Sequence, residues 1–294
     1  MMNSFITYLQ YEKKFSSHTV LAYKEDLSQF QLFICSRINT CNFSTIDASL
    51  AREWVVSLKQ AQYSISSINR KISTLKSFYT YCKKQSITTA SPFSSIHALK
   101  NKKQLPVFLK DMEMEELLSS DDIFTKSPYE NARDRIVIEI FYHTGIRRDE
   151  LINLKDGDIN LFSLTLQVTG KGNKQRLIPF SKTLQKSIGK YLAIKAETIK
   201  STSDSFILSN KGKPAYPMLL YRIVQEYIGK VSSVTKKSPH VIRHTFASAL
   251  LNNGAEINAV KELLGHANLA ATQIYTHTTF EQLKKSYKQA HPRD

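Results

Sequence analysis

Four residues near the C-terminus carry side chains that could act on a phosphodiester: His240, Arg243, His266 and Tyr275. His240 and Arg243 are three residues apart in a segment whose apolar residues repeat at helical spacing, so both should project from one helical face. Phosphate transfer requires a nucleophile, proton carriers and cations for the non-bridging oxygens. Tyr275 can supply the nucleophile, and His240 and Arg243 would hold an acid–base group beside a fixed positive charge.

Each of these residues also has a purely structural explanation. A helical His-x-x-Arg is common on solvated faces, a helical tyrosine is usually in a core, and LLGH at 263–266 could be a helix end capped by Gly265. Their order and spacing indicate more than that. The succession of HVIRH, then LLGH, then IYTH nine residues later resembles the C-terminal signature of the tyrosine recombinases, also called the phage integrase family.

The resemblance continues upstream. Residues 143–154, HTGIRRDELINL, are similar to the first arginine box of the family, which implies a catalytic Arg147 and a supporting carboxylate at Glu150. Residues 168–179, VTGKGNKQRLIP, predict two short strands around a glycine-rich turn. The family resemblance places the catalytic lysine there, at Lys171. From the residues alone, an ordinary turn with a solvated lysine remains the alternative, and the chain has no P-loop pattern.

The resemblance implies a two-step exchange of phosphodiester bonds. Tyr275 attacks the scissile phosphate and forms a 3′-phosphotyrosyl bond, and a 5′-hydroxyl departs. An unperturbed tyrosine has a pKa of about 10, so only ~0.1% is ionised at pH 7 and the site must assist. In the family pattern His240 assists proton transfer at the tyrosine, and Lys171 protonates the leaving oxygen.

The remaining implied roles concern the phosphate itself. Arg147 and Arg243 would clamp its oxygens with their fork geometry. By resemblance, His266 hydrogen-bonds the phosphate and Glu150 orients the pocket. With two guanidiniums neutralising charge, no metal or other cofactor is expected. The pair in Asp156-Gly-Asp158 could suggest Mg²⁺, but Asp and Gly are expected in a turn before a strand.

The function implied is that of a site-specific DNA recombinase acting in integration, excision, inversion or chromosome dimer resolution. Two alternatives belong to other classes: a relaxing enzyme similar to type IB topoisomerases, and a non-catalytic DNA-binding module. The first would give relaxed plasmid instead of strand exchange between two sites. Retention of all seven site residues argues against the second, which would form no covalent adduct with DNA.

Charge independently indicates a polyanionic partner, which the family resemblance implies to be double-stranded DNA. Lys and Arg number 41 against 25 acidic residues, a net charge of +16. Residues 1–105 contain 14 basic and 5 acidic side chains, and the remaining residues 27 and 20, so both parts are basic. Both parts should therefore face DNA.

The predicted fold class is mainly α with a small antiparallel β-sheet, in two domains. Residues 1–90 should form a helical, SAM-like core-binding domain, 91–106 an interdomain linker rich in Ser and Lys, and 107–294 the catalytic domain with a C-terminal tail helix. Apolar periodicity predicts the helices, and Ser17, Asp47 and Ser64 stand at or near plausible N-caps. Their ranges are 2–14, 18–36, 47–60, 64–85, 110–119, 128–143, 181–199, 217–230, 240–253 and 257–264.

Cysteine usage and hydropathy favour the cytoplasm. Cys35, Cys41 and Cys82 are an odd number without metal-site spacing, and Cys82 continues a helical apolar stripe, so reduced packing thiols are expected. The N-terminus has no apolar run of the length that a signal peptide or a membrane span requires.

The C-terminal tail predicts assembly. Its last residues, YKQAHPRD, resemble those of the Xer-type recombinases, which resolve chromosome dimers. Phe280, Leu283 and Tyr287 form a short apolar stripe that should dock on a neighbouring copy or a partner recombinase, with a tetramer on two DNA sites; packing on its own domain is the alternative. The chain departs from the family pattern at 148–149 and at 268 and 271, where no catalytic residue stands.

Overall fold

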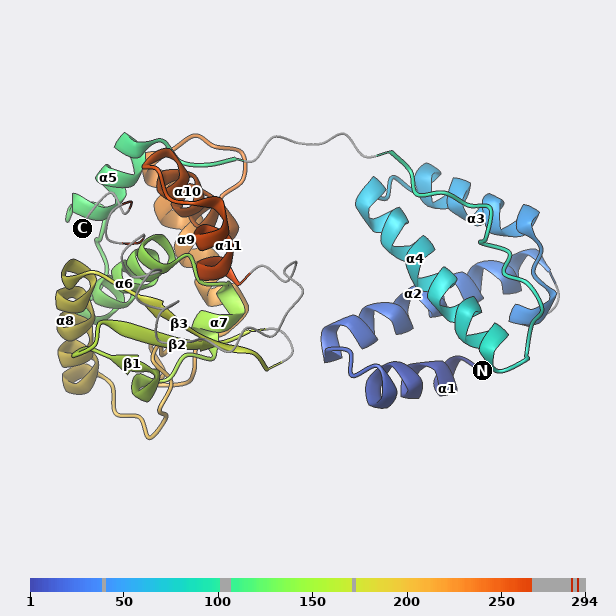
Figure 1. Ribbon diagram of the computed structural model, residues 1–294, viewed down its shortest axis with the longest axis horizontal. Coiled ribbons are helices and arrows are strands. Elements are labelled where there is room, and N and C mark those ends of the chain that lie inside the picture. The colour runs from blue at the N-terminus through green and yellow to red at the C-terminus, as the bar shows by residue number, and fades with distance from the viewer. Residues whose placement is uncertain (39–40, 101–106, 171–172, 266–286, 288–289, 291–294) are drawn as a thin grey trace. The chain divides into compact units, whose positions relative to one another are not determined.

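The chain forms two compact units, Met1–Gln104 and Leu105–Asp294, each with its own hydrophobic core (Figure 1). The structure, a computed structural model, describes residues 1–38, 41–100, 107–170, 173–265, 287 and 290. Within these ranges most ordered residues are helical, and the second unit contains a three-stranded antiparallel sheet. The predicted fold class is confirmed. No helix in the described ranges has the length and apolar character needed to cross a membrane.

The first unit is a bundle of helices whose starts are set by side-chain caps. Asp47 and Ser64, two of the predicted caps, accept hydrogen bonds from backbone N–H groups three residues ahead, while the longest helix is capped by Ser16. The predicted first helix is divided, because its second half is a π-helical turn. The elements are α1 (Met2–Thr7), η1 (Tyr8–Glu12), α2 (Ser17–Arg37), η2 (Phe43–Thr45), α3 (Ala48–Gln60) and α4 (Ile65–Lys84).

Aromatic side chains fill the core of this unit. The ring of Phe30 lies 4.8 Å from Trp54, and the hydroxyl of Tyr79 donates to the carbonyl of Phe43 at 2.9 Å, so a buried polar group is satisfied. Phe93 and Ile96 are buried in the same core. The first part of the segment 91–106, predicted as linker, therefore contributes to the packing of the N-terminal unit.

The three cysteines differ in state. Cys82 is free and buried in α4, in agreement with a packing thiol. Cys35 and Cys41 form a disulfide, with their Cα atoms 4.8 Å apart. The prediction of a reduced thiol is thus wrong for these two residues, whose Cα atoms lie within the usual range for a disulfide.

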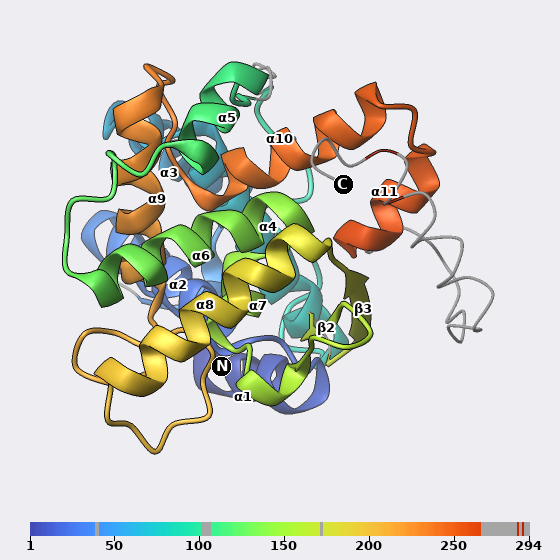
Figure 2. The ribbon, with the colours of Figure 1, turned by 90° about the vertical axis from the view of Figure 1, so that its left-hand side faces the viewer.

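The second unit is built around α6 (Pro128–Thr144), which packs against α8 (Lys182–Thr198) and α10 (Pro239–Asn252) (Figure 2). Nearly all of its second half is buried, so it lacks the one-sided pattern of a surface helix. Pro128 and Ser127 start the helix, and Gly145 ends it. The other helical elements are α5 (Asp111–Ser119), α7 (Arg148–Ile152), η3 (Asp156–Asp158), α9 (Pro217–Val231) and α11 (Ile257–Leu264).

The sheet contains the predicted hairpin and one further short strand. Its order is β1 (Ile159–Asn160), β2 (Thr165–Thr169) and β3 (Gln175–Pro179), all antiparallel. In the hairpin, Leu166 pairs with Ile178 and Val168 with Arg176. All four of these side chains are buried, so Arg176 is a charged residue on the buried face of the hairpin.

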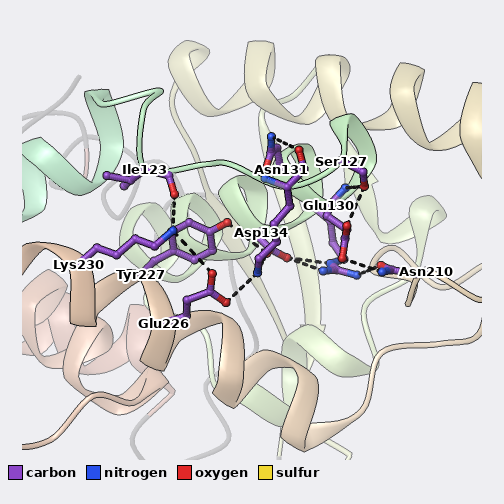
Figure 3. Close-up of polar contacts among 11 residues, drawn as sticks. Ile123, Ser127, Glu130, Asn131, Asp134, Asn210, Glu226, Tyr227 and Lys230 are labelled. Carbon is purple, nitrogen blue, oxygen red and sulfur yellow. Dashed lines mark hydrogen bonds and ion pairs between the residues drawn. The ribbon is translucent and has the colours of Figure 1, made fainter.

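An ionic network with a buried centre ties α6 to α9, and we call it the Asp134 cluster (Figure 3). The carboxylate of Asp134 accepts hydrogen bonds from Arg133 at 2.7 Å and from Lys126 at 2.9 Å. Lys126 also binds Glu226, which in turn lies 3.7 Å from Lys230. The cluster is completed by Tyr227, Glu130 and Asn210.

The tail contacts its own unit at the two positions that the structure describes there. Tyr287 is buried, and its hydroxyl donates to the carbonyl of His143 at 2.9 Å. Ala290 is also buried, and its carbonyl accepts from Asn253 at 2.8 Å. In this structure Tyr287 therefore packs in its own unit, as in the alternative, and not on a neighbour. The core of that unit provides an apolar site and a hydrogen-bond acceptor for its side chain. Phe280 and Leu283 lie outside the described residues.

Candidate active site

Arg147 and Glu150, predicted as a pair, meet at the start of α7. The chain leaves α6 through Gly145, whose φ of 58° is left-handed, and a Cβ there would lie 2.4 Å from the ring of Phe246. The backbone N–H of Arg147 then donates to Glu150 Oε2 at 2.7 Å, and its Nη1 donates to Oε1 at 2.8 Å. Glu150 thus caps the short helix and orients the guanidinium.

His240 and Arg243 lie in the first turns of α10, as their spacing predicted. Pro239 is the first helical residue, a position where its missing N–H costs nothing. Arg243 is buried, and it donates through Nη1 to the carbonyl of Gly145 and through Nη2 to that of Leu264, the latter at 2.6 Å. His240 is exposed one turn earlier. A neutralising cation therefore stands inside the protein, and an acid–base group at its edge.

His240 and Arg243 differ in their charge at neutral pH. Partial desolvation lowers the pKa of His240, and the positive charge of Arg243 lowers it further. The imidazole is thus neutral at pH 7 and free to accept a proton. Burial, followed by the charge of Arg147, lowers the pKa of Arg243 to about 10. Arg243 still remains charged at neutral pH.

Arg176 belongs to the same group, although the sequence analysis did not single it out. Its Nη1 donates to Glu150 Oε1 at 2.7 Å and its Nη2 to Oε2 at 2.9 Å, a bidentate pair. A signal was present in the sequence: in QRLIP, Arg176 alternates with Ile178 on the face expected to be buried. A buried guanidinium needs hydrogen-bond acceptors, and Glu150 was the carboxylate already assigned to the site.

Three arginines cap one helix. α11 ends at Gly265, in the left-handed conformation predicted for a C-cap. The carbonyls of residues 263, 264 and 265 accept, in that order, from Arg176 Nε at 3.0 Å, from Arg243 Nη2 at 2.6 Å and from Arg147 Nη2. Helix C-terminal carbonyls carry partial negative charge and need donors, so they help to hold three like charges together. We call Glu150, Arg147, Arg176 and Arg243 the Glu150 cluster.

Both units match known families. The model of the phage integrase family matches residues 107–282, and that of the phage integrase N-terminal SAM-like domain matches residues 2–86. Tyrosine recombinase XerC of Listeria innocua is 37% identical over 292 residues, covering 98% of this chain and 96% of that protein. The XerC of Staphylococcus saprophyticus is 36% identical over 293 residues, covering 100% and 97%. The chain belongs to the phage integrase family.

Solved structures agree with this membership. The XerH site-specific recombinase, in a post-cleavage complex with palindromic difH substrate, superimposes with a TM-score of 0.72 and 25% identity, covering 91% of this chain and 78% of that one. The integrase of transposon Tn1549 with transposon right end DNA has a TM-score of 0.70 and covers 98% of both chains; at 22% identity it supports the fold alone. The chain is accordingly a tyrosine recombinase, the enzyme class that cuts and rejoins DNA strands.

Three of the predicted site residues of this tyrosine recombinase, Lys171, His266 and Tyr275, lie outside the described residues. The residues that precede two of them are described. A Cβ on Gly170 would lie 3.3 Å from Glu150 Oε1, and one on Gly265 would lie 3.0 Å from Arg176 Nη1. The hairpin turn and the end of α11 therefore both leave the described structure beside the Glu150 cluster.

Asp156 and Asp158, considered as metal ligands from the sequence, have structural partners. Asp156 accepts two hydrogen bonds from Lys195 Nζ, both at 2.8 Å, and Asp158 accepts from the backbone N–H of Lys155 at 2.9 Å. Among the described residues no group of three or more His, Cys, Asp or Glu is arranged to hold a metal ion. These two carboxylates stabilise the approach to the sheet.

Proposed function

We propose that the chain cuts and rejoins double-stranded DNA at specific sites through a 3′-phosphotyrosyl intermediate on Tyr275. The proposal is carried by the Glu150 cluster, in which three guanidiniums surround one carboxylate, so positive charge is left over for an anion. Arg147 is the most accessible of the charged groups, since 36% of its side chain is exposed. A phosphodiester is the anion whose two non-bridging oxygens match such donors.

In the proposed reaction the hydroxyl of Tyr275 attacks phosphorus, and the bond to the 5′-oxygen breaks. The phenolic proton passes to His240, which the lowered pKa keeps neutral. Lys171 gives a proton to the departing oxygen, while Arg147, Arg243 and the His266 side chain bind the non-bridging oxygens. One phosphodiester is exchanged for another, so a 5′-hydroxyl from a second DNA end reverses the step without an external energy source.

The proposed partner is double-stranded DNA. XerH was solved with its difH substrate, and this chain, with its net charge of +16, has the charge expected for the same kind of ligand. Residues 1–90 as a DNA-binding domain, 91–106 as the linker and 107–294 as the catalytic domain stay predictions, as do the tetramer and the cytoplasmic location. Docking of the tail on a neighbour would require Tyr287 to leave its own core.

The test is capture of the covalent adduct. A nicked suicide substrate lets the cleaved strand diffuse away, so wild-type protein should accumulate as a protein–DNA band in a denaturing gel. Tyr275→Phe should bind the same DNA in a gel shift and form no band, because only the nucleophilic hydroxyl is removed.

The matched control is Tyr129→Phe. Tyr129 lies at the start of α6, and its hydroxyl donates to the carbonyl of Leu208 at 3.0 Å. The Glu150 cluster lies beyond the other end of that helix. A helix of this length separates the two by roughly 20 Å. Tyr129→Phe should therefore form the adduct at the wild-type rate. An adduct with Tyr275→Phe would refute the assignment of the nucleophile.

A further inference from the structure

Arg176 contacts the catalytic apparatus without being exposed to a substrate. Only 6% of its side chain is accessible, and its three nitrogen atoms all donate to protein oxygens: two to Glu150 and one to the carbonyl of Leu263. Gly265 packs against the guanidinium, since a Cβ there would lie 3.0 to 3.2 Å from its atoms. Arg176 therefore has no room to bind DNA directly, and any influence on cleavage passes through its partners.

Its main partner is the carboxylate that holds Arg147. Glu150 Oε1 accepts from Nη1 of Arg176 and from Nη1 of Arg147, and Oε2 accepts from Nη2 of Arg176 and from the backbone N–H of Arg147. Both residues therefore share the carboxylate, but only Arg176 binds both oxygens through its guanidinium. Burial alone raises the pKa of Glu150, but the hydrogen bonds and charge of Arg176, followed by those of Arg147, lower it to about 2. Among the groups that stabilise the ionised carboxylate, Arg176 has the larger effect.

This sharing has an electrostatic consequence. A carboxylate paired with Arg147 alone would neutralise that guanidinium and weaken its attraction for a phosphate. Because Arg176 occupies both oxygens of Glu150, the pair Glu150–Arg176 is close to neutral, and the charge of Arg147 remains available. The bond from Arg176 Nε to Leu263 also fixes the end of α11, whose next two carbonyls orient Arg243 and Arg147.

We propose that Arg176 is a positioning residue of the recombinase, which holds Glu150 and the end of α11 so that the guanidinium of Arg147 is aimed, and stays positively charged, toward the scissile phosphate. The proposal deepens the proposed function and rests on it. Lysine cannot replace arginine in this place, because a single ammonium cannot bind both carboxylate oxygens and the Leu263 carbonyl with the same geometry.

The test compares Arg176→Lys with Arg133→Lys. Arg133 is equally buried and makes two hydrogen bonds to Asp134, but it belongs to the Asp134 cluster. Both variants lose a buried arginine–carboxylate contact made through two nitrogen atoms, which in Arg133 both donate to Asp134 Oδ1. We expect Arg176→Lys to form the suicide-substrate adduct about 10- to 100-fold more slowly per folded molecule, with single-site DNA affinity within about threefold of wild type. Arg133→Lys should cleave at the wild-type rate once the folded fraction is taken into account.

A second substrate separates positioning from general weakening. Replacing one non-bridging oxygen of the scissile phosphate by methyl removes its charge, so the reaction depends less on an aimed guanidinium. On at least one of the two methylphosphonate stereoisomers, the defect of Arg176→Lys should shrink to within about threefold of wild type. If Arg176→Lys fails to fold, Arg176→Gln, which keeps an N–H donor and removes the buried charge, is measured in the same way.

The outcomes are distinct. Absence of an adduct with wild-type protein on ordinary DNA would refute the proposed function itself. A normal wild-type adduct, with equal defects of the Arg176 variant on phosphate and on both methylphosphonates, would overturn the positioning role. Equal cleavage by the Arg176 and Arg133 variants would overturn it as well.

Discussion

The Asp134 cluster and the Glu150 cluster each contain a buried arginine–carboxylate pair and both contact α6, yet their charges differ. In the Asp134 cluster, Lys126, Arg133 and Lys230 stand against Asp134, Glu226 and Glu130 (Figure 3). In the Glu150 cluster, one carboxylate faces three guanidiniums.

The difference distinguishes a structural network from a binding site. A balanced network satisfies its members and needs no ligand, whereas an excess of positive charge in a partly buried place is costly until an anion arrives. The lowered pKa of Arg243 reports this cost, because nearby Arg147 and Arg176 both repel its proton in addition to the effect of burial. The carbonyl ends of α6 and α11 offset part of the repulsion.

The largest effect is expected from Asp134→Asn. This change leaves Arg133 and Lys126 without their buried carboxylate, which should lower the free energy of unfolding by about 3 to 5 kcal/mol in urea denaturation. Adduct formation per folded molecule should not change. Glu226→Gln is the control, and its loss should stay below about 1 kcal/mol because the side chain is 38% exposed. A cleavage defect in folded Asp134→Asn protein would break the comparison.

Arg243→Gln should show the opposite pattern, with a large loss of cleavage and a small loss of stability. Loss of one phosphate clamp should slow adduct formation by about 10²- to 10³-fold, equivalent to roughly 3 to 4 kcal/mol of barrier. The free energy of unfolding should fall by only about 1 to 2 kcal/mol, since two hydrogen bonds are lost while repulsion is relieved. Arg135→Gln, which removes a partly exposed pair with Asp121, serves as control for cleavage. A stability loss as large as that of Asp134→Asn would show that Arg243 is mainly structural.

Anion binding should be specific to the Glu150 cluster. Sulfate at about ten times its dissociation constant should stabilise the wild-type fold by roughly 1.4 kcal/mol through linkage. Arg147→Gln should lose this increment, and Arg133→Lys should keep it. Melting temperatures measured in sulfate and in chloride at equal ionic strength, for all three proteins, separate binding from the general salt effect. The same increment in Arg147→Gln protein would mean that the excess charge binds no anion.

The smallest effect concerns pH. His240 must be neutral to accept a proton, and its lowered pKa means that it becomes protonated only below the ordinary value of about 6.5. Between pH 7.5 and 6.0, adduct formation at subsaturating protein should therefore fall by less than about fourfold, with the fall steepening at lower pH. His240→Gln should be slower throughout and lack this acid limb. If the rate of His240→Gln protein fell at acid pH as in the wild type, the group that titrates there would be another residue.

The local elements of the fold could be read from the sequence because their signals act over a few residues. Asp47 and Ser64 cap the helices that they were expected to cap, and the glycine-rich turn joins two strands that pair as a hairpin. Gly265 ends α11 in the left-handed conformation. Apolar periodicity could not reveal that the first helix becomes π-helical at Tyr8, since the apolar spacing continues through the π-helical residues.

The contents of the candidate site were predictable in part. Arg147, Glu150, His240 and Arg243 were identified by type and order, and the structure brings them together. Arg176 was missed because a charged residue in a strand becomes informative only when its partner is known, and Glu150 lies 26 residues away. The positions of Lys171, His266 and Tyr275 stay predictions.

The sequence by itself determined most of the longer helices, the hairpin, the family and most residue types of the site. Only the tertiary structure decided which buried charge meets which. The bonds from Arg147 to the end of α11 and from Tyr287 to His143 span 118 and 144 residues. Short-range preferences fix the backbone locally, whereas such pairings depend on how complete elements pack. Packing also decides which charged groups are buried away from water and must therefore find partners within the protein.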